Sequence, residues 1–246
     1  MSNKPWELKT DDHRKADTLP TFIIFCEDGV CEPIYFKSFE TPFIKINTIP
    51  NQKSDLDNVA NALTHCREKG IMDEALEMVN SDDIEIWCVF DMDCTQGTDI
   101  KNEVRFQSSI ELAQSKGLKV AWSNDAFELW ILMHFQDIGT GEEYKYRTIY
   151  YEKLTAIFSE LPQKNDRLIR ALAHSSFNYK QDLKHENNFR GIVLPELRAK
   201  SEVAIKRADE LEERYKRQGI SEIVKQSPCT KVHHLVRGLL EAGMPD

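Results

Sequence analysis

The sequence has no long hydrophobic run, and this lack argues against a membrane-spanning helix. Its strongly apolar stretches are all short, far below the roughly 20 residues that cross a bilayer. Residues 1–20 are polar and mixed in charge, so we expect no secretory signal there. With 41% hydrophobic and 30% charged residues, the 246-residue chain has the composition of a folded protein able to bury a sizeable core.

The six cysteines lack the spacing of a zinc site or a redox pair. No two of them form Cys-x-x-Cys. Cys26 and Cys88 lie inside apolar, strand-like runs, where a thiol behaves as a small hydrophobic group. We therefore expect reduced cysteines in a cytoplasmic protein.

An overall excess of positive charge is also missing. The net charge of −9 argues against a basic surface covering the whole molecule. Residues 163–217 differ, because they contain 13 Lys and Arg against 9 Asp and Glu. This local balance fits an acidic core with a more basic helical attachment, although a solvated helical surface would give the same count.

What the sequence does contain, up to about residue 143, is an alternation of short apolar runs and helical patterns. The expected strands are 21–26, 43–47, 84–90 and 118–122, and the expected helices are 32–39, 55–69, 72–80, 99–116 and 128–135. Such alternation predicts an α/β fold with a mostly parallel sheet and helices on both faces.

From about residue 144 the patterns are helical only. Helices are expected at 151–161, 166–174, 195–218 and 230–241, with no convincing strand among them and with Thr230 as an N-cap. The change of pattern predicts an α/β core over residues 18–143 and a C-terminal helical extension over residues 144–246.

Acidic residues follow two of the expected strands. Glu27 comes directly after the run that ends at Cys26, and Asp91 and Asp93 follow the run that ends at Phe90. Ligands of parallel sheets bind beyond the carboxyl ends of the strands. Two aspartates two residues apart point to the same side if the strand continues. The pattern predicts a Mg²⁺ site of three carboxylates, although aspartates at strand ends also cap following helices.

Asp91-Met-Asp-Cys-Thr95 also fits a second class of enzyme. An apolar strand followed by Asp-x-Asp-x-Thr is similar to the nucleophile motif of haloacid-dehalogenase-type phosphatases, with Asp91 as nucleophile and Asp93 as general acid and base. Those enzymes usually place this motif near the start, and a later strand ends in paired aspartates. Here about 90 residues precede the motif, and no clear strand after Trp122 ends that way. Metal binding is the favoured interpretation.

Glu128 and three histidines are further candidates. Glu128 lies among apolar residues of an expected helix, so it must be either paired or functional, and we count it among the candidate catalytic residues. The alternative for Glu128 is a structural hydrogen bond. We expect His134, on the same helix, to be a core histidine. His233 and His234 have no acid at ligand spacing, which favours a surface or core role.

Four stretches together resemble a known family. They are CEDGVCEPIYF (26–36), VFDMD (89–93), WSNDAFELWILMHF (122–135) and SPCTKVHHLV (227–236). The third is the most specific of them. The likeness is to the RloB-like branch of the Toprim superfamily, and it extends along most of the chain.

The resemblance implies a Toprim-like, Rossmann-like fold with a helical extension and a metal-dependent nuclease site. By this likeness Glu27 is the Toprim glutamate, and Asp91 and Asp93 are its metal-binding aspartates. The expected cofactor is Mg²⁺, with Mn²⁺ as a substitute, and the expected substrate is DNA or RNA. The resemblance also implies a role in bacterial defence against phage, beside a partner ATPase.

The chain departs from the family pattern at two places. The family usually has Gly after the glutamate, where this chain has Asp28 followed by Gly29, and its usual Ser-Asn-Pro-Cys-Phe-Glu is here Ser-Asn-Asp-Ala-Phe-Glu. Asp28 could narrow the approach of a substrate to the backbone or add a fourth metal ligand. These departures keep a second function open, a catalytically inactive Toprim-like module that binds a partner ATPase or nucleic acid.

Overall fold

A five-stranded sheet forms the centre of the molecule in the computed structural model, which describes residues 19–78, 83–93 and 100–245. The strand order is β2-β1-β3-β4-β5. The first four strands are parallel, and β5 pairs with β4 in the antiparallel sense. The strands are β1 (Thr21–Cys26), β2 (Lys45–Ile49), β3 (Ile84–Asp91), β4 (Lys119–Asn124) and β5 (Cys229–Thr230). The predicted α/β fold is confirmed.

The two central strands are apolar along nearly their whole length because both faces of the sheet are covered. In β1 the residues Phe22 to Cys26 are all buried, as are Ile86 to Phe90 in β3. The edge strand β2 instead buries only Ile46. The continuous apolar runs in the sequence therefore mark the middle of the sheet, where the acidic motifs follow.

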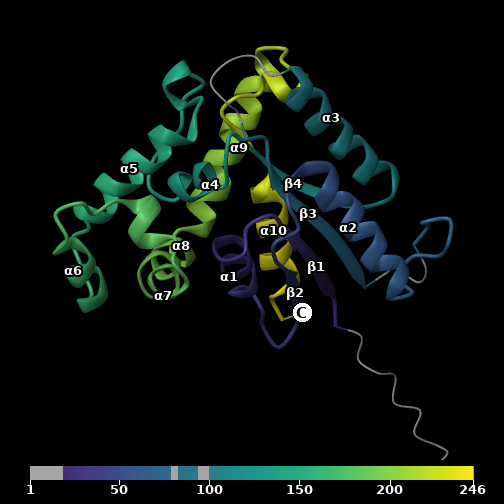
Figure 1. Cartoon of the computed structure of the whole chain (residues 1–246), viewed down its shortest axis with the longest axis horizontal. Helices are drawn as coiled ribbons and strands as arrows, with labels where there is room; N and C mark the ends of the chain where they lie inside the picture. Colours follow the sequence, from purple (N-terminus) through teal and green to yellow (C-terminus); the bar gives the residue numbers. More distant parts are fainter. Residues whose placement is uncertain (1–18, 79–82, 94–99, 246) are drawn as a thin grey trace, which may run out of the picture.

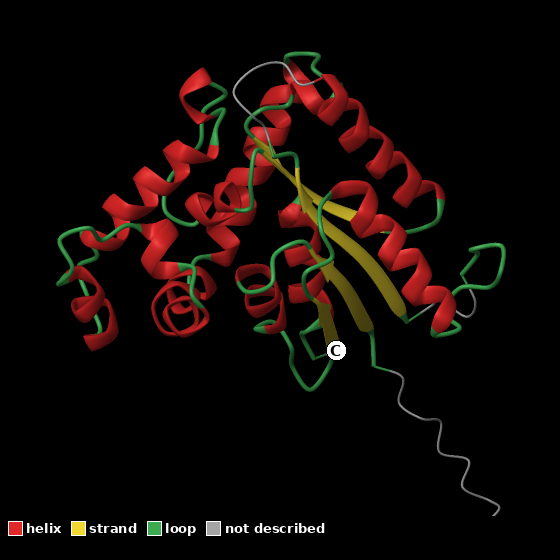
Figure 2. Cartoon of the chain, viewed as in Figure 1, coloured by secondary structure: helices red, strands yellow, loops and turns green. Residues whose placement is uncertain are grey.

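Helices cover both faces of the sheet (Figures 1 and 2). The helices of the core are α1 (Cys31–Lys37), α2 (Asp55–Glu68), α3 (Ile100–Ser115) and α4 (Glu128–Met133). Helices α2 and α3 pack against each other and against β1, β3 and β4 on one face, whereas α1 packs on β1 and β2 on the other. Figure 1 shows α1 and the C-terminal helix on the side of the sheet opposite α2 and α3.

The helical extension packs beside the core, with its own buried aromatic residues Tyr150, Phe158, Tyr179 and Phe189. Its helices are α5 (Arg147–Ser159), α6 (Asp166–Leu172), α7 (Glu186–Asn188), α8 (Leu194–Arg198), α9 (Ser201–Arg217) and α10 (Val232–Ala242). Two π-helical segments, Tyr179–Leu183 and Phe189–Val193, and two 3₁₀ turns, Glu142–Tyr144 and Ile223–Lys225, complete it. Contacts of α9 with α4 join the extension to the core.

Two predicted helices are wrong in part. The segment predicted as a helix from residue 72 forms a turn closed by a bridge between Met72 and Met78, and residues 79–80 of that prediction lie outside the described part of the chain. Asp73 organises this turn, since its Oδ1 accepts hydrogen bonds from the N–H groups of Ala75 (2.8 Å) and Glu77 (3.0 Å). A side chain that satisfies nearby backbone donors competes with helix formation.

The helix predicted over 195–218 is two helices, because α8 ends before Lys200 and α9 starts after it. The N–H of Lys200 donates to the carbonyl of Leu197 (3.0 Å), a tightened last turn that ends α8. Lys200 itself has φ −123° and ψ 12°, which is outside the helical range. The break lets α9 take its own direction beside α4.

The prediction of an extension without strands is also wrong, because β5 adds two residues to the sheet. Thr230 belongs to β5, and Lys231 takes the N-cap position of α10 that was predicted for Thr230. The Thr230 hydroxyl accepts from the N–H of Val232 (3.2 Å) and pairs with the Ser123 hydroxyl of β4 (3.1 Å). After this turn α10 packs on β4, so residues 229–242 of the predicted extension return to the core.

The cysteines and the lengths of the helices agree with the expectations from composition. The five described cysteines are free and buried, and Cys94 lies outside the described residues. Over residues 19–78, 83–93 and 100–245, no helix combines the length and the apolar character that spanning a bilayer requires.

Candidate functional site

Two of the three predicted acids meet at the carboxyl edge of the sheet, where β1 and β3 end side by side. Cys26 of β1 is level with Val89 of β3, and the N–H of Glu27 donates to the carbonyl of Val89 (3.2 Å). Glu27 turns its carboxylate toward the end of β3, and its Oε2 accepts from the N–H of Asp91 (2.9 Å). The Asp91 carboxylate points to the start of α4, where Oδ2 accepts from the N–H of Phe127 (3.0 Å).

Asp93 lies farther out than the spacing predicts. Strand β3 ends at Asp91, and Asp93 has φ +52°, so the alternation that would turn both aspartates to one side stops between them. The N–H of Asp93 donates to the carbonyl of Asp125 (3.3 Å), which holds the chain beside the end of β4. The Asp93 carboxylate is half exposed and forms an ion pair with Arg147.

The donor set of this edge fits a hard divalent cation. Glu27, Asp91 and Asp93 offer only oxygen, which is what Mg²⁺ prefers in proteins. Their carboxylate oxygens do not all lie within 4.8 Å of one another, whereas another group of described residues meets that spacing. Asp91 and Asp93 would hold the ion, Asp93 through one of the waters that Mg²⁺ usually keeps, and Glu27 would be a further ligand or the base for an attacking water.

Electrostatics at the edge also favour a cation. The pKa of Glu27 is raised to about 7, chiefly by burial, while the hydrogen bond from the N–H of Asp91 lowers it and the charge of Asp93 raises it. Burial likewise raises the pKa of Asp91 well above its ordinary value, and repulsion by Glu27 and Glu32 adds to the effect. Desolvated carboxylates that repel one another gain most from a bound positive ion.

Glu32 is an acid of this site that the sequence did not single out. It is 1% exposed on α1, and its Oε2 accepts from the N–H of Asp28 (3.2 Å). Burial, together with the charges of Asp28 and Glu27, raises its pKa well above the ordinary value. Its position four residues after Asp28, in the first turn of a helix that follows an acidic loop, was the available signal.

Asp28 caps the start of α1 in this structure. Its Oδ1 accepts from the N–H of Val30 (2.9 Å) and its Oδ2 from the N–H of Cys31 (3.0 Å). Both oxygens are therefore engaged by backbone donors of the loop. Asp28 could narrow the approach of a substrate or add a fourth metal ligand, and these contacts do not favour the second, because both oxygens already accept from backbone N–H groups.

Arg147, from the extension, is the principal cation beside the acids. It is the first residue of α5, and it is held by the buried Asp125 through its backbone N–H (2.8 Å to Oδ2) and its guanidinium (3.0 Å to Oδ1). The same guanidinium donates to the carbonyl of Asp125 (2.9 Å) and contacts Asp93. A guanidinium fixed in this way presents a permanent positive charge at the rim of the site.

Glu128 is paired as well as buried. It is 3% exposed at the start of α4, and Lys184 lies 2.6 Å from its Oε1. The Lys184 ammonium also lies over the ring of Tyr151, 5.8 Å from the centroid. The structure therefore favours the paired alternative for Glu128, with Lys184 as the partner.

His134 has the surroundings of a core histidine. It is 1% exposed, its Nδ1 lies 2.9 Å from the Trp130 carbonyl, and its Nε2 lies 3.2 Å from the Tyr35 hydroxyl. Burial lowers its pKa to about 3, so the ring is neutral at physiological pH. The Nε2 contact joins the end of α4 to α1, and the Nδ1 contact lies within α4.

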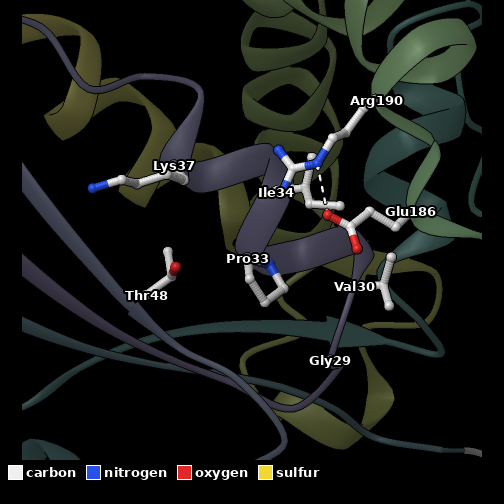
Figure 3. Close-up of a pocket in the computed structure, with 8 residues that line it drawn as sticks. All are labelled: Gly29, Val30, Pro33, Ile34, Lys37, Thr48, Glu186 and Arg190. Atoms are coloured by element: carbon white, nitrogen blue, oxygen red, sulfur yellow. Dashed lines mark hydrogen bonds and ion pairs between the residues drawn. The ribbon is translucent and has the colours of Figure 1, made fainter.

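A small cavity of about 160 Å³ lies on the β2 side of the acidic turn. Its lining residues are Gly29, Val30, Pro33, Ile34, Lys37, Thr48, Glu186 and Arg190. Figure 3 shows Arg190 reaching over Ile34 to Glu186, an ion pair of 3.0 Å, while Lys37 points away from them. Lys37 is itself bound by Glu40 (2.6 Å) and by the Ile46 carbonyl (2.7 Å). We assign this cavity no part in the chemistry.

Comparison with known proteins places the chain in a family. The model of the RloB-like protein family matches residues 22–239, which is most of the chain. The chain belongs to the RloB-like family. A search of curated proteins and a search of solved structures found no match. In this RloB-like chain the matched span includes every residue of the site described above, from Glu27 to Lys184.

The two cations of the site had no local signal in the sequence. Arg147 and Lys184 come from the extension, 22 residues after Asp125 and 56 residues after Glu128. Asp125 lies inside the motif Ser-Asn-Asp-Ala-Phe-Glu, one of the departures from the family pattern, and its burial with Arg147 gives that departure a structural role. The RloB-like site is thus an acidic sheet edge flanked by cations of the extension.

Proposed function

We propose that the protein is a Mg²⁺-dependent nuclease that cleaves DNA or RNA phosphodiesters. The observation that supports this most is the hydrogen bond from the N–H of Asp91 to Glu27, because it brings acids 64 positions apart to one edge of the sheet. The proposal also draws on the likeness to the Toprim superfamily, and Mn²⁺ is expected to replace Mg²⁺.

In the proposed mechanism Asp91 and Asp93 would hold the metal, and the bound ion would supply positive charge to offset the negative charge of the attacked phosphate and of the leaving oxygen. Glu27 accepts the proton of the attacking water. In the metal-free chain the pKa of Glu27 is about 7, and a general base works best when its pKa lies near the working pH. The water oxygen bonds to phosphorus, and the bond from phosphorus to the leaving oxygen breaks.

In this mechanism Arg147 would bind a phosphate group of the substrate. Its guanidinium is anchored on Asp125 and lies at the exposed side of Asp93, where the substrate would arrive. Planar guanidinium groups pair well with phosphate oxygens. Glu128, which was a candidate catalytic residue, is expected to keep Lys184 in place beside the site.

We propose that the protein carries out this activity in the cytoplasm. By family resemblance the protein would act in bacterial defence against phage, together with a partner ATPase, and nucleic acid would be its substrate. The more basic stretch 163–217 offers a surface for such partners, although its basic residues are largely interleaved with acids.

The test is cleavage of end-labelled single-stranded DNA, duplex DNA and RNA with Mg²⁺ or Mn²⁺. Asp91→Asn and Glu27→Gln should each lower the rate by at least about 100-fold, because each removes charge at the reacting phosphate. Glu202→Gln, an exposed acid on α9, is the matched control and should leave the rate unchanged. Full activity in Asp91→Asn would exclude the assignment.

One observation favours a second function, the catalytically inactive binding module. The three acids do not converge within 4.8 Å, and Asp93 is paired with Arg147. A module of this kind would bind the ATPase or nucleic acid with equal affinity in wild type and Asp91→Asn, and neither would cleave. A phosphatase of the haloacid-dehalogenase type would instead hydrolyse a generic phosphomonoester and accumulate phosphorylated Asp91.

A further inference from the structure

A second group of possible metal ligands lies away from the acidic edge, between α9 and α10. Glu212 belongs to the last part of α9, and His233 and His234 belong to the first turn of α10. The two helices pack against each other. The sequence offered no acid near the two histidines, and the fold supplies one from 21 positions earlier.

The spacing of the ligand atoms fits a tetrahedral ion. His233 Nε2 lies 3.3 Å and His234 Nε2 lies 3.2 Å from Glu212 Oε2, and all three ligand atoms lie within 4.8 Å of one another. Bonds of about 2.0–2.1 Å around a tetrahedral Zn²⁺ place neighbouring ligand atoms about 3.3 Å apart. Each histidine nitrogen therefore has the separation from the carboxylate that a shared ion requires.

The burial of His233 is a second observation that points to a ligand. Its side chain is fully buried, yet neither of its ring nitrogens has a hydrogen-bond partner of acceptable geometry. The Nε2 contacts with Glu212 Oε2 (3.3 Å) and Asp209 Oδ1 (3.5 Å) do not meet that geometry. A buried polar atom without a partner is costly, and a metal ion would satisfy the nitrogen that faces Glu212.

We propose that Glu212, His233 and His234 form a binding site for Zn²⁺ or a similar borderline divalent ion, with water as the fourth ligand. Imidazole nitrogen suits Zn²⁺ and its neighbours in the first transition row, whereas Mg²⁺ prefers oxygen alone. The site is thus of a different chemical class from the acidic edge, and it does not depend on the proposed nuclease function.

The lysines around Glu212 fit the role of supporting contacts. Lys231 lies 2.7 Å from Oε2 and Lys216 lies 3.2 Å from Oε1. A carboxylate has about four lone-pair directions, so it can accept from both lysines and still offer one direction to an ion. Metal-bound carboxylates are usually hydrogen-bonded in this way, which fixes their orientation.

The expected role of the ion is structural. Helix α10 buries Val232, Leu235, Val236 and Leu239, and α9 packs on α4 of the core. An ion shared by α9 and α10 would fasten these helices to each other at the point where the chain has just left β5. Binding of the ion would then stabilise the folded chain, because the unfolded chain cannot assemble the three ligands.

The test uses the full-length chain with Asp93→Asn, so that the acidic edge is weakened as a competing site. After chelator treatment and dialysis, Co²⁺ is added as an optical probe of tetrahedral coordination and Zn²⁺ is added in thermal unfolding. We expect one ion per chain and a Tm increase of about 5 °C or more at Zn²⁺ concentrations 100-fold above Kd.

Variants of the cluster decide whether these three residues are the ligands. His234→Ala and Glu212→Gln should each abolish the Co²⁺ spectrum and the Zn²⁺-dependent rise in Tm, and the 43% exposed side chain of His234 makes its removal tolerable for folding. His174→Ala, an exposed histidine elsewhere in the extension, should bind as the parent does. Absence of stoichiometric binding in the parent, or undiminished binding in His234→Ala, would overturn the proposal.

Discussion

Two pairs of acids near the sheet edge differ in the presence of a cation from the extension. Asp125 and Glu128 are buried and paired, with Arg147 at 3.0 Å and Lys184 at 2.6 Å. Glu27 and Asp91 lie at the same edge and are bound by backbone N–H groups. Burial raises the pKa of both Glu27 and Asp91 above the ordinary values.

This contrast separates acids that maintain the structure from acids that are available for chemistry. A paired carboxylate has its charge offset within the protein, and removing its partner leaves that charge uncompensated. A carboxylate held by backbone donors keeps a strong affinity for an external cation. The extension therefore contributes to the site by pairing the first group and leaving the second unpaired.

The largest effect on stability is expected from Lys184→Met. The substitution leaves Glu128 buried without its partner, and we expect the free energy of unfolding to fall by about 2–3 kcal/mol, allowing for the partial exposure of Lys184. Urea unfolding at pH 7 measures the change. Lys180→Met is the matched control, because Lys180 also lies over the Tyr151 ring but is exposed.

A double variant sharpens this test. Adding Glu128→Gln to Lys184→Met removes the uncompensated charge, so the double variant should regain much of the lost stability. If the double variant were less stable than the sum of the single changes, the pair would not be the reason that Glu128 is tolerated in the core.

A smaller effect should appear in the pH dependence of stability. Glu27 has a pKa of about 7 in the folded chain and an ordinary value of 4.5, so between these values the unfolded chain loses a proton that the folded chain keeps. Stability should therefore fall as pH rises from about 4.5 to 7 and level off above.

Glu27→Gln tests the origin of this dependence. Urea unfolding of the variant and the wild type at pH 5 and pH 8, in the presence of a chelator, should show a smaller loss of stability in the variant. Equal losses in both proteins would mean that Glu27 is not the titrating group. Glu27 would then no longer belong with Asp91 among the acids without a cation partner.

The smallest effect is expected from Asp28→Gly. The variant loses the hydrogen bonds from Asp28 to the N–H groups of Val30 and Cys31, so we expect a loss of about 1 kcal/mol in the free energy of unfolding. Mn²⁺ affinity, measured by calorimetry, should stay within about twofold of the wild-type value. A tenfold loss of affinity would instead make Asp28 a ligand and move it into the unpaired group.

The sheet and the location of the acids could be predicted because their signals are local. The continuous apolar runs of β1 and β3 are read directly from consecutive residues, and Glu27 and Asp91 follow them at once. Parallel pairing then brings the two strand ends together, and in the observed register Cys26 of β1 lies opposite Val89 of β3. The proximity of Glu27 and Asp91 could thus be predicted from the sequence.

The features that escaped prediction depend on tertiary contacts or on very short elements. The turn at Asp93 follows from the way the chain lies against Asp125, which no periodicity encodes. Arg147 comes from α5 and Lys184 directly follows the segment Tyr179–Leu183, both far along the chain from their partners, and β5 has only two residues. The break at Lys200 interrupts an otherwise uniform helical pattern, so the periodicity of the sequence predicts one continuous helix across it.

The return of α10 to the sheet has a consequence for synthesis of the protein. The apolar side chains Val232, Leu235, Val236 and Leu239 cover one face of strands that are made some 100 residues earlier in the chain, around residues 119–124. That face stays uncovered on the nascent chain until these residues have left the ribosome, so the polypeptide passes through a stage with exposed apolar surface, which is prone to aggregation. A premature stop before residue 232 would leave that face without α10, and we expect such a product to aggregate or to be retained by chaperones.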